Sequence, residues 1–216
     1  MRRSLSLAAA TTLAFSLMGA SFASTDDTEI AKVGAIIARS KLTRDIYAVY
    51  FWNRIQHPEQ QAVEEWSAEF NSGSLHRVET PRDRVIADCV AHTGTYLSLI
   101  SGQKVSGPQV AGAACGINTN RQFLAVESLG RVKNQFADAD RVRVTDAENV
   151  RTYDISDNGI ILRTIFETND DRRLTVLDVE TVGITGSLPN ADMFDESSLS
   201  VSFVPERFRI APKSLR

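Results

Sequence analysis

Residues 150–168 read VRTYDISDNGIILRTIFET, and the middle of this stretch gives the clearest structural signal in the chain. Asn158 and Gly159 readily adopt the positive φ angles of a two-residue hairpin turn. The flanking residues are rich in β-branched and aromatic side chains, which favour strands. A second turn at residues 169–171 leads to another strand-like run at 173–184. We therefore expect a three-stranded antiparallel meander.

Strand patterns also occur before the meander. Over residues 84–91, one set of alternate positions is apolar throughout and the other carries the two charged residues, Arg84 and Asp88. The runs at 123–126 and 141–145 are also strand-like. This period of two is typical of half-buried strands. Residues 189–216 are richer in Ser, Pro, Asp and Asn. They are expected to cover the sheet, with a short strand at 199–204.

The chain before residue 74 predicts helices. Asp26 and Glu29 have the spacing of a capping box, which marks a helix start. A second helical piece is expected over residues 43–56, either separate or as one kinked helix that continues the first. A third is expected between Pro58 and Gly73. The apolar positions that carry these patterns are Ile30, Val33, Ile36, Ile37, Val63, Trp66 and Phe70.

Helices that precede a mainly antiparallel sheet predict an α+β fold. We expect N-terminal helices packed on a curved, mainly antiparallel β-sheet. Residues 24–216 form a single α+β domain in this prediction, with a helical part (24–73), a β-rich part (74–188) and a covering tail (189–216). The hollow of the curved sheet is where small apolar ligands bind in such shapes.

The first 23 residues predict a cleaved export signal. Arg2 and Arg3 precede a mildly apolar run, and small residues at 21 and 23 suit a signal peptidase. The run is short and diluted by polar residues, so no stable transmembrane segment is expected after cleavage. The arginine pair leaves twin-arginine export as an alternative to general secretion. The mature protein is expected to be periplasmic or secreted.

The charge balance of the mature chain argues against nucleic-acid binding. Removing residues 1–23 takes two of the 24 Lys and Arg residues and none of the 27 Asp and Glu residues. The formal net charge therefore falls from −3 to about −5. Nucleic-acid binding depends on clustered Lys and Arg that neutralise phosphates. A small apolar ligand or an envelope protein is the expected partner instead.

The chain has two cysteines, Cys89 and Cys115, both in the mature part. An even pair in an oxidising compartment predicts one disulfide bond. The alternative is a redox or nucleophilic thiol, but the sequence has no Cys-x-x-Cys motif. We expect the disulfide to be structural.

Histidine and aromatic side chains give two further candidate sites. If His76 and His92 lie on paired strands with Asp88 or Glu79 nearby, they form a polar or zinc-binding site. Surface or hydrogen-bonded histidines are the default interpretation. The second candidate is an aromatic binding surface, since the four residues involved cover more than one face of the expected helix. Core packing is the default interpretation of such a group, and a partner or ligand surface is the alternative. This aromatic group comprises Tyr47, Tyr50, Phe51 and Trp52.

Familiar catalytic and cofactor-binding motifs are incomplete in this sequence. Residues 101–104 match Ser-x-x-Lys, but the neighbouring glycines and proline predict a loop where that motif needs a helix. Residues 154–159 resemble half of a calcium loop and lack the acid that closes it. We therefore expect a non-catalytic binding protein without a cofactor. The alternative is an exported hydrolase or metal-dependent enzyme that uses His76 or His92.

Overall fold

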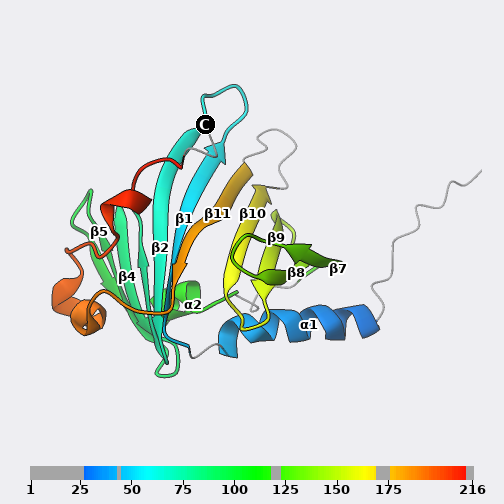
Figure 1. The fold of residues 1–216 in the computed structure, drawn as a ribbon, viewed down its shortest axis with the longest axis horizontal. Coiled ribbons are helices and arrows are strands. Elements are labelled where there is room, and N and C mark those ends of the chain that lie inside the picture. Colours follow the sequence, from blue (N-terminus) through cyan, green and yellow to red (C-terminus); the bar gives the residue numbers. More distant parts are fainter. Residues whose placement is uncertain (1–26, 43–44, 118–122, 169–175, 213–216) are drawn as a thin grey trace, which may run out of the picture.

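The protein folds around one long antiparallel β-sheet (Figure 1). The structure is a computed structural model that describes residues 27–42, 45–117, 123–168 and 176–212. Within these ranges, eleven strands form the sheet in the order β6-β5-β4-β3-β2-β1-β11-β10-β9-β8-β7. No helix in the described ranges is long and apolar enough to cross a lipid bilayer.

The sheet has a simple path through the chain. Strands β1 to β6 follow one another to one edge, and β7 to β11 return from the opposite edge to pair with β1. The elements are α1 (Asp27–Leu42), β1 (Tyr47–Gln56), β2 (Val63–Ser72), β3 (Leu75–Glu79), β4 (Asp83–Asp88), β5 (Thr93–Ser98), β6 (Lys104–Ser106), α2 (Pro108–Ala114), β7 (Ala125–Lys133), β8 (Asp138–Thr145), β9 (Asn149–Ser156), β10 (Ile161–Thr168), β11 (Val176–Thr185) and the 3₁₀ helices η1 (Ala191–Phe194), η2 (Glu196–Ser198) and η3 (Glu206–Phe208).

The predicted α+β fold with N-terminal helices packed on the sheet is wrong. Of the helices expected between residues 24 and 73, only α1 forms, and the other two regions are the adjacent strands β1 and β2. Every side chain from Tyr47 to Asn53 is buried, so β1 is covered on both faces and shows no alternation of apolar and polar residues. The aromatic residues of this buried segment favour a strand, but a continuous apolar segment without alternation fits a buried helix as well as a buried strand.

The predicted meander is confirmed. Strands β9 and β10 pair antiparallel around the turn that contains Asn158 and Gly159, and β10 pairs antiparallel with β11. The alternating run at residues 84–91 contains β4, while the runs at 123–126 and 141–145 overlap β7 and β8.

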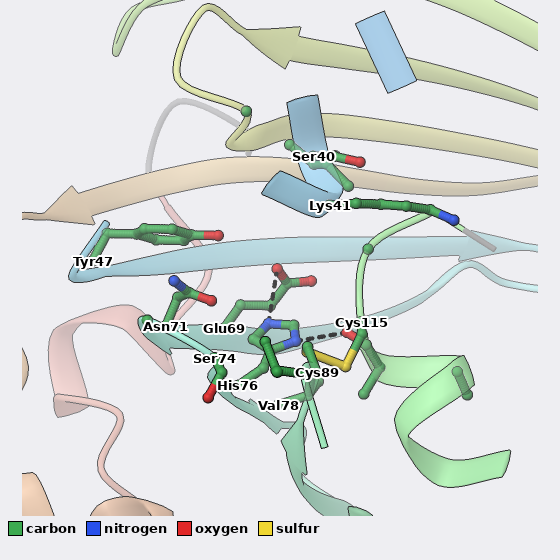
Figure 2. Close-up of a pocket in the computed structure, with 17 residues that line it drawn as sticks. Ser40, Lys41, Tyr47, Glu69, Asn71, Ser74, His76, Val78, Cys89 and Cys115 are labelled. Carbon is green, nitrogen blue, oxygen red and sulfur yellow. Dashed lines mark hydrogen bonds and ion pairs between the residues drawn. A yellow bond between two sulfur atoms is a disulfide. The ribbon is translucent and has the colours of Figure 1, made fainter. Parts of the chain in front are cut away.

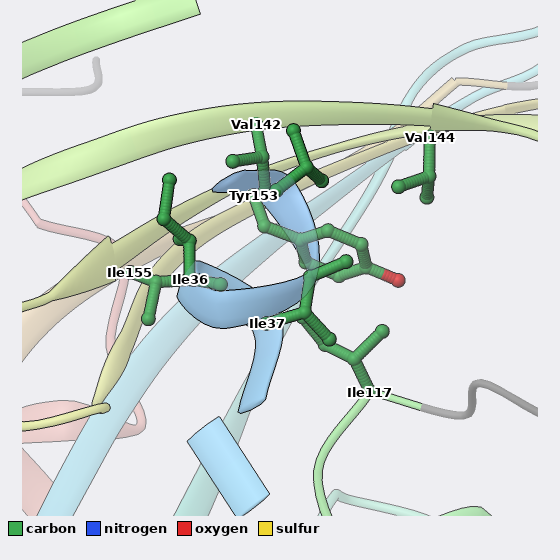
Figure 3. Close-up of a cluster of buried hydrophobic side chains, with 8 residues drawn as sticks. Ile36, Ile37, Ile117, Val142, Val144, Tyr153 and Ile155 are labelled. Atoms are coloured by element: carbon green, nitrogen blue, oxygen red, sulfur yellow. The ribbon is translucent and has the colours of Figure 1, made fainter. Parts of the chain in front are cut away.

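Helix α1 closes one part of the sheet by packing on β7, β8 and β9. Val33, Ile36 and Ile37 are buried on this side, whereas Ile30 is 48% exposed. Figure 3 shows Ile36 and Ile37 against the side chains of β8 and β9. The cluster contains Val33, Ile36, Ile37, Ile117, Val142, Val144, Tyr153 and Ile155.

The chain after residue 188 covers the opposite face of β1, β2 and β3. Met193 and Val204 pack against Tyr50 and Phe70, and the ring of Phe208 stacks on Tyr50 with centroids 4.0 Å apart. The short strand expected at residues 199–204 does not form, and this segment is instead a turn followed by irregular backbone between η2 and η3. The backbone here is held by side chains of the sheet.

A buried charged pair on β3 holds this covering segment. Arg77 donates from Nε to Glu79 Oε1 at 2.7 Å. Its four terminal N–H groups face Met193 O, Ser198 Oγ, Ser198 O and Val201 O at 2.6–3.2 Å. All five guanidinium N–H groups therefore have acceptors. Glu79 in turn accepts from Ser202 Oγ at 2.7 Å, so the pair binds the tail at several points.

In the part of the chain that the structure describes, the two edge strands of the sheet do not pair with each other, and at each edge a local feature hinders the pairing of a further strand. At one edge, the Ser128 backbone N–H of β7 donates to the side chain of Glu29 in α1. The register of β7 shifts between Ser128 and Gly130, which breaks its regular edge. At the other edge, β6 has only three residues, and its Lys104 forms an ion pair with Glu196.

Candidate functional site

A polar cavity of about 290 Å³ lies where the end of α1, the strands β1 to β3, the turn after β4 and the end of α2 come together (Figure 2). Its charged and titratable walls are Lys41 of α1, Glu69 of β2 and His76 of β3. The other lining residues are Ser40, Tyr47, Asn71, Gly73, Ser74, Val78, Cys89, Val90, Ala113, Ala114, Cys115, Gly116, Gly159 and Ile161.

The register of the strands places the polar groups on one face. Tyr47 pairs with Asn71, and Asn71 pairs with His76. Glu69 pairs with Val78 in the neighbouring row. Side chains of directly paired residues lie on the same face of a sheet. The cavity therefore depends on the pairing of three strands that follow one another in sequence.

Helix α2 forms the wall opposite the sheet. It starts with Pro108, which suits the first position of a helix. A Cβ atom on Gly94 of β5 would lie 2.9 Å from the backbone nitrogen of Ala111, so a glycine there allows α2 to approach the strand closely. Cys115, directly after α2, is bonded to Cys89, as predicted, with their Cα atoms 5.6 Å apart. This bond fixes the end of α2 beside β4.

His76 is one of two buried titratable groups that line the cavity, the other being Tyr47. Its Nδ1 lies 2.6 Å from the carbonyl oxygen of Ala114. A carbonyl only accepts, so Nδ1 carries a proton and donates. The other ring nitrogen, Nε2, is buried without a hydrogen-bond partner and lies 3.5 Å from Glu69 Oε2. His76 thus connects the carboxylate on the sheet to the end of α2.

The surroundings shift two pKa values in this cavity. Burial alone would lower the pKa of His76, but Glu69 and the Ala114 carbonyl outweigh it and raise the pKa above the ordinary 6.5. Burial, with the charges of Glu69 and Asp45, raises the pKa of Tyr47. Tyr47 therefore stays a neutral phenol at physiological pH.

Replacing His76 with glutamine should lower the free energy of unfolding more at about pH 5 than at about pH 8. A folded-state pKa above the unfolded value stabilises the protein fully below that unfolded value, near 6.5, and the benefit is lost as the pH rises through the folded pKa. Glutamine still donates to Ala114 but has no charge to pair with Glu69. Urea unfolding in metal-free buffer at both pH values measures the difference, with the exposed His92→Gln as the control. An equal loss at both pH values would contradict this assignment.

The structure does not bring the three predicted polar-site residues together. His92 lies exposed in the turn after β4, at a φ of 54°. Asp88 pairs with Leu75, one position away from the row of His76, so it faces the other side of the sheet. Its Oδ1 accepts from the backbone N–H groups of Val90 and Ala91 at 2.9 and 3.0 Å. In the part of the chain that the structure describes, no three His, Cys, Asp or Glu side chains converge as a metal site.

Of the two readings of the aromatic group, core packing is the one that the structure shows, and the candidate binding surface does not form. Tyr47, Tyr50, Phe51 and Trp52 are each no more than 8% exposed, because they lie on β1 in the middle of the sheet. Tyr50 contacts the covering tail on one face. Tyr47 lines the cavity on the other, so it is the one member of this group at the candidate site.

Glu69 and Asn71 are site residues that the helical interpretation of this region missed. A signal for them exists, because apolar Trp66, Ala68 and Phe70 alternate with polar residues over this part of β2. Period two places Glu69 and Asn71 together on one strand face. The i, i+4 spacing of Trp66 and Phe70 fits a helix equally well. The apolar pattern alone therefore does not distinguish a strand from a helix here.

A second cavity of about 320 Å³ adjoins the first beneath α2. Both cavities are lined by Val78, Ala113 and Ala114, so they share one wall. The second is more apolar, because Val85 and the ring of Tyr96 face α2 there alongside Val78. Its full lining is Val78, Val85, Tyr96, Gln109, Val110, Ala113 and Ala114.

Comparisons with known proteins do not place the chain in a family. No family model matches it, and no curated protein matches its sequence. A LolA superfamily protein from Nitrosomonas europaea is 11% identical, with a TM-score of 0.41 over 77% of this chain and 99% of that one. A conserved protein from Thermus thermophilus is 11% identical, with a TM-score of 0.49 over 84% and 98%. A DUF1329 family protein from Desulfovibrio piger is 7% identical, with a TM-score of 0.39 over 77% and 98%.

Proposed function

We propose that the protein is an exported, non-catalytic binding protein for a small amphipathic ligand held between the sheet and α2. The observation that carries this proposal is the junction of a polar cavity with an apolar one at Val78, Ala113 and Ala114. Each cavity, at about 300 Å³, is near the lower end of the size range of small-molecule pockets. A ligand that fills both has a polar end near His76 and an apolar end near Tyr96.

The apolar end has the physical properties of a binding pocket. Val78, Val85 and the ring of Tyr96 are only partly buried, although they face α2 on the inner side of the sheet. Covering this apolar surface with an aliphatic chain contributes about 25 cal/mol per Å². The polar end supplies Glu69, His76 and Asn71, which orient a head group.

Export is supported by the bonded cysteines. Both cysteines of the chain are joined in the Cys89–Cys115 disulfide. Such bonds persist in oxidising compartments such as the bacterial periplasm. The expected signal, residues 1–23, lies outside the described residues. The periplasm or the extracellular space is therefore the proposed location.

The geometry at His76 does not favour the hydrolase alternative. A histidine that activates a nucleophile needs one ring nitrogen directed at that nucleophile. In this cavity Nδ1 donates to the Ala114 carbonyl, and Nε2 faces the carboxylate of Glu69. Neither nitrogen faces a hydroxyl group. His92, the other histidine of this alternative, is exposed in a turn.

Binding of dansylaminoundecanoic acid, a fluorescent amphipathic probe, tests the proposal. The mature protein should bind it saturably, with a blue shift as the dansyl group leaves water. Val78→Phe places a ring at the junction of the two cavities and should weaken binding by at least about 10-fold. Val63→Phe makes the same change at an exposed position of β2, 49% exposed, and should leave the affinity unchanged.

Two results would overturn this function. One is the absence of saturable probe binding to the folded mature protein. The other is equal affinity in the wild type and Val78→Phe, since the probe would then bind elsewhere. Thermal unfolding of both variants checks that each is folded before its affinity is compared.

A further inference from the structure

The disulfide bond forms part of the wall of the polar cavity, because both of its cysteines line it. Cys89 lies in the turn after β4, and Cys115 directly follows α2 (Figure 2). From Cys115 the chain continues through Gly116 to Ile117, which is buried in the cluster of α1, β8 and β9 (Figure 3). We call residues 115–117 the strap. Together with the disulfide, the strap joins the turn after β4 to the other half of the sheet.

This connection is short, although the strands that it joins are far apart in the sheet. Six strand spacings separate β4 from β9, which is about 29 Å along the sheet. The Cα atoms of Cys89 and Cys115 are 5.6 Å apart, so the path from Cys89 to Ile117 spans at most about 13 Å. A short link across a long row of strands requires the sheet to curve toward the face that carries the link (Figure 1). The strap therefore crosses the hollow side of the sheet.

The end of the strap at α1 is held by close packing. Gly116 has a φ of 70°, and a Cβ atom there would lie 3.2 Å from the carbonyl oxygen of Ser40 in the last turn of α1. The next residue, Ile117, is only 3% exposed. This end of the strap is therefore fixed by the core that α1 forms with the sheet.

The end of the strap at α2 depends more on the disulfide. Helix α2 has seven residues, of which only Val110 and Ala111 are buried. A helix this short is not stable by itself. His76 adds one hydrogen bond, from Nδ1 to the carbonyl of Ala114. The covalent bond to Cys89 therefore provides much of the attachment of α2 and the strap to β4.

We propose that the Cys89–Cys115 disulfide is a redox switch that controls release of the ligand. The oxidised protein holds α2 and the strap over the sheet, and reduction loosens α2 and opens the cavities beneath it. This inference rests on the proposed function, because the ligand of that proposal lies between the sheet and α2. Both cysteines are partly exposed, so a reductant has access to the bond.

The switching reaction is thiol–disulfide exchange with a dithiol, such as the active-site cysteine pair of a thiol oxidoreductase. One thiolate of the dithiol attacks a sulfur of the Cys89–Cys115 bond, which forms a mixed disulfide and releases the other cysteine as a thiolate. The second thiol of the dithiol then attacks the mixed disulfide and releases the first cysteine. The dithiol is oxidised to a disulfide, and its two electrons and two protons pass to the thiols of Cys89 and Cys115.

Hydrogen exchange with mass spectrometry tests the switch without a ligand. Complete reduction of the mature protein with dithiothreitol should speed exchange of the amides of residues 108–117 by at least about 10-fold. The amides of β9 and β10 should exchange as slowly as before. The double variant Cys89→Ser with Cys115→Ser should match the reduced protein and should not respond to dithiothreitol. Unchanged exchange over residues 108–117, or equal acceleration in β9 and β10, would overturn the switch.

The dissociation rate of dansylaminoundecanoic acid, measured by stopped flow, tests the effect on the ligand site. Reduction should raise this rate by at least about 10-fold. In the oxidised protein, Ile117→Ala weakens the other attachment of the strap and should also raise the rate. Ile210→Ala is the matched control at a position that is 54% exposed, and it should have no effect. Circular dichroism confirms that each variant is folded.

The two experiments separate this inference from the proposed function. Equal dissociation rates before and after complete reduction would overturn the switch, even if the oxidised protein binds the probe. Absence of probe binding to the oxidised protein would count against the proposed function, and hydrogen exchange then still shows whether the disulfide holds α2.

Discussion

Replacing Arg77 with methionine should lower the free energy of unfolding by about 3–5 kcal/mol. The guanidinium group is fully buried and donates to Glu79 and to the tail backbone at Met193, Ser198 and Val201. Methionine fills a similar volume but removes the closer of the two guanidinium groups that pair with Glu79, leaving only Arg84 at 3.5 Å, and it leaves the tail carbonyls without donors. Urea unfolding gives the size of the loss, and limited proteolysis should show faster cleavage after residue 188.

Arg82→Met is the matched control for this prediction. Arg82 also forms an ion pair, to Glu65 at 2.8 Å, but its side chain is 50% exposed. Exposed pairs contribute only about 0–1 kcal/mol. A double change, Arg77→Met with Glu79→Leu, should recover little of the loss, because the buried guanidinium of Arg84, whose Nε lies 3.5 Å from Glu79 Oε2, then loses its carboxylate. Equal stability of the Arg77 and Arg82 variants would show that the buried pair does not hold the tail.

Replacing Gly159 with alanine should lower the free energy of unfolding by about 2–5 kcal/mol. Gly159 has a φ of 86° in the β9–β10 turn, a conformation that costs other residues energy. A Cβ atom there would also collide with the carbonyl of Arg39 in the last turns of α1. The collision pushes α1 away from the sheet, so Val33 and Ile37 should become exposed to an apolar dye.

Gly130→Ala separates the two causes. Gly130 has nearly the same φ, 85°, but nothing lies within 4 Å of the position that its Cβ would take. It should cost only the backbone strain, about 1–2 kcal/mol, and should not increase dye binding. If both glycine variants lost the same stability, close packing of α1 on the turn would not be what constrains Gly159.

The parts of the fold that were predictable from sequence are those set by local chemistry. Asn158 and Gly159 define a turn through their own backbone preferences, so the meander followed from a few residues. Strand β1 lacks such a signal because side chains on both of its faces are buried. Its Phe51 lies in the core on one side of the sheet, and its Tyr50 lies in the core on the other. Its cover comes from segments distant in sequence, including Phe208. A continuous apolar run in the sequence does not show which distant segments will pack on its two faces.

The candidate site was less predictable because it depends on strand register. His76 was a candidate from sequence, but its neighbours come from the pairing of β2 with β3. Reading β2 as a helix removed Glu69 and Asn71 from consideration. A shift of one residue in register moves a side chain to the other face, which is why Asp88 lies away from His76. The disulfide was predictable because only two cysteines exist.

The contact between Glu29 of α1 and the Ser128 backbone of β7 has a consequence for self-assembly. An open sheet exposes rows of unpaired amides, and a second copy of the chain readily extends such a row into a growing fibre. Here the backbone N–H of Ser128, which a further strand would need for pairing, already donates to the carboxylate of Glu29. The register shift between Ser128 and Gly130 also misaligns the backbone groups beyond it. Helix α1, which covers the core, therefore also hinders β7 from pairing with a strand of another molecule. Loss of α1 would turn a self-limiting molecule into a seed for polymerisation.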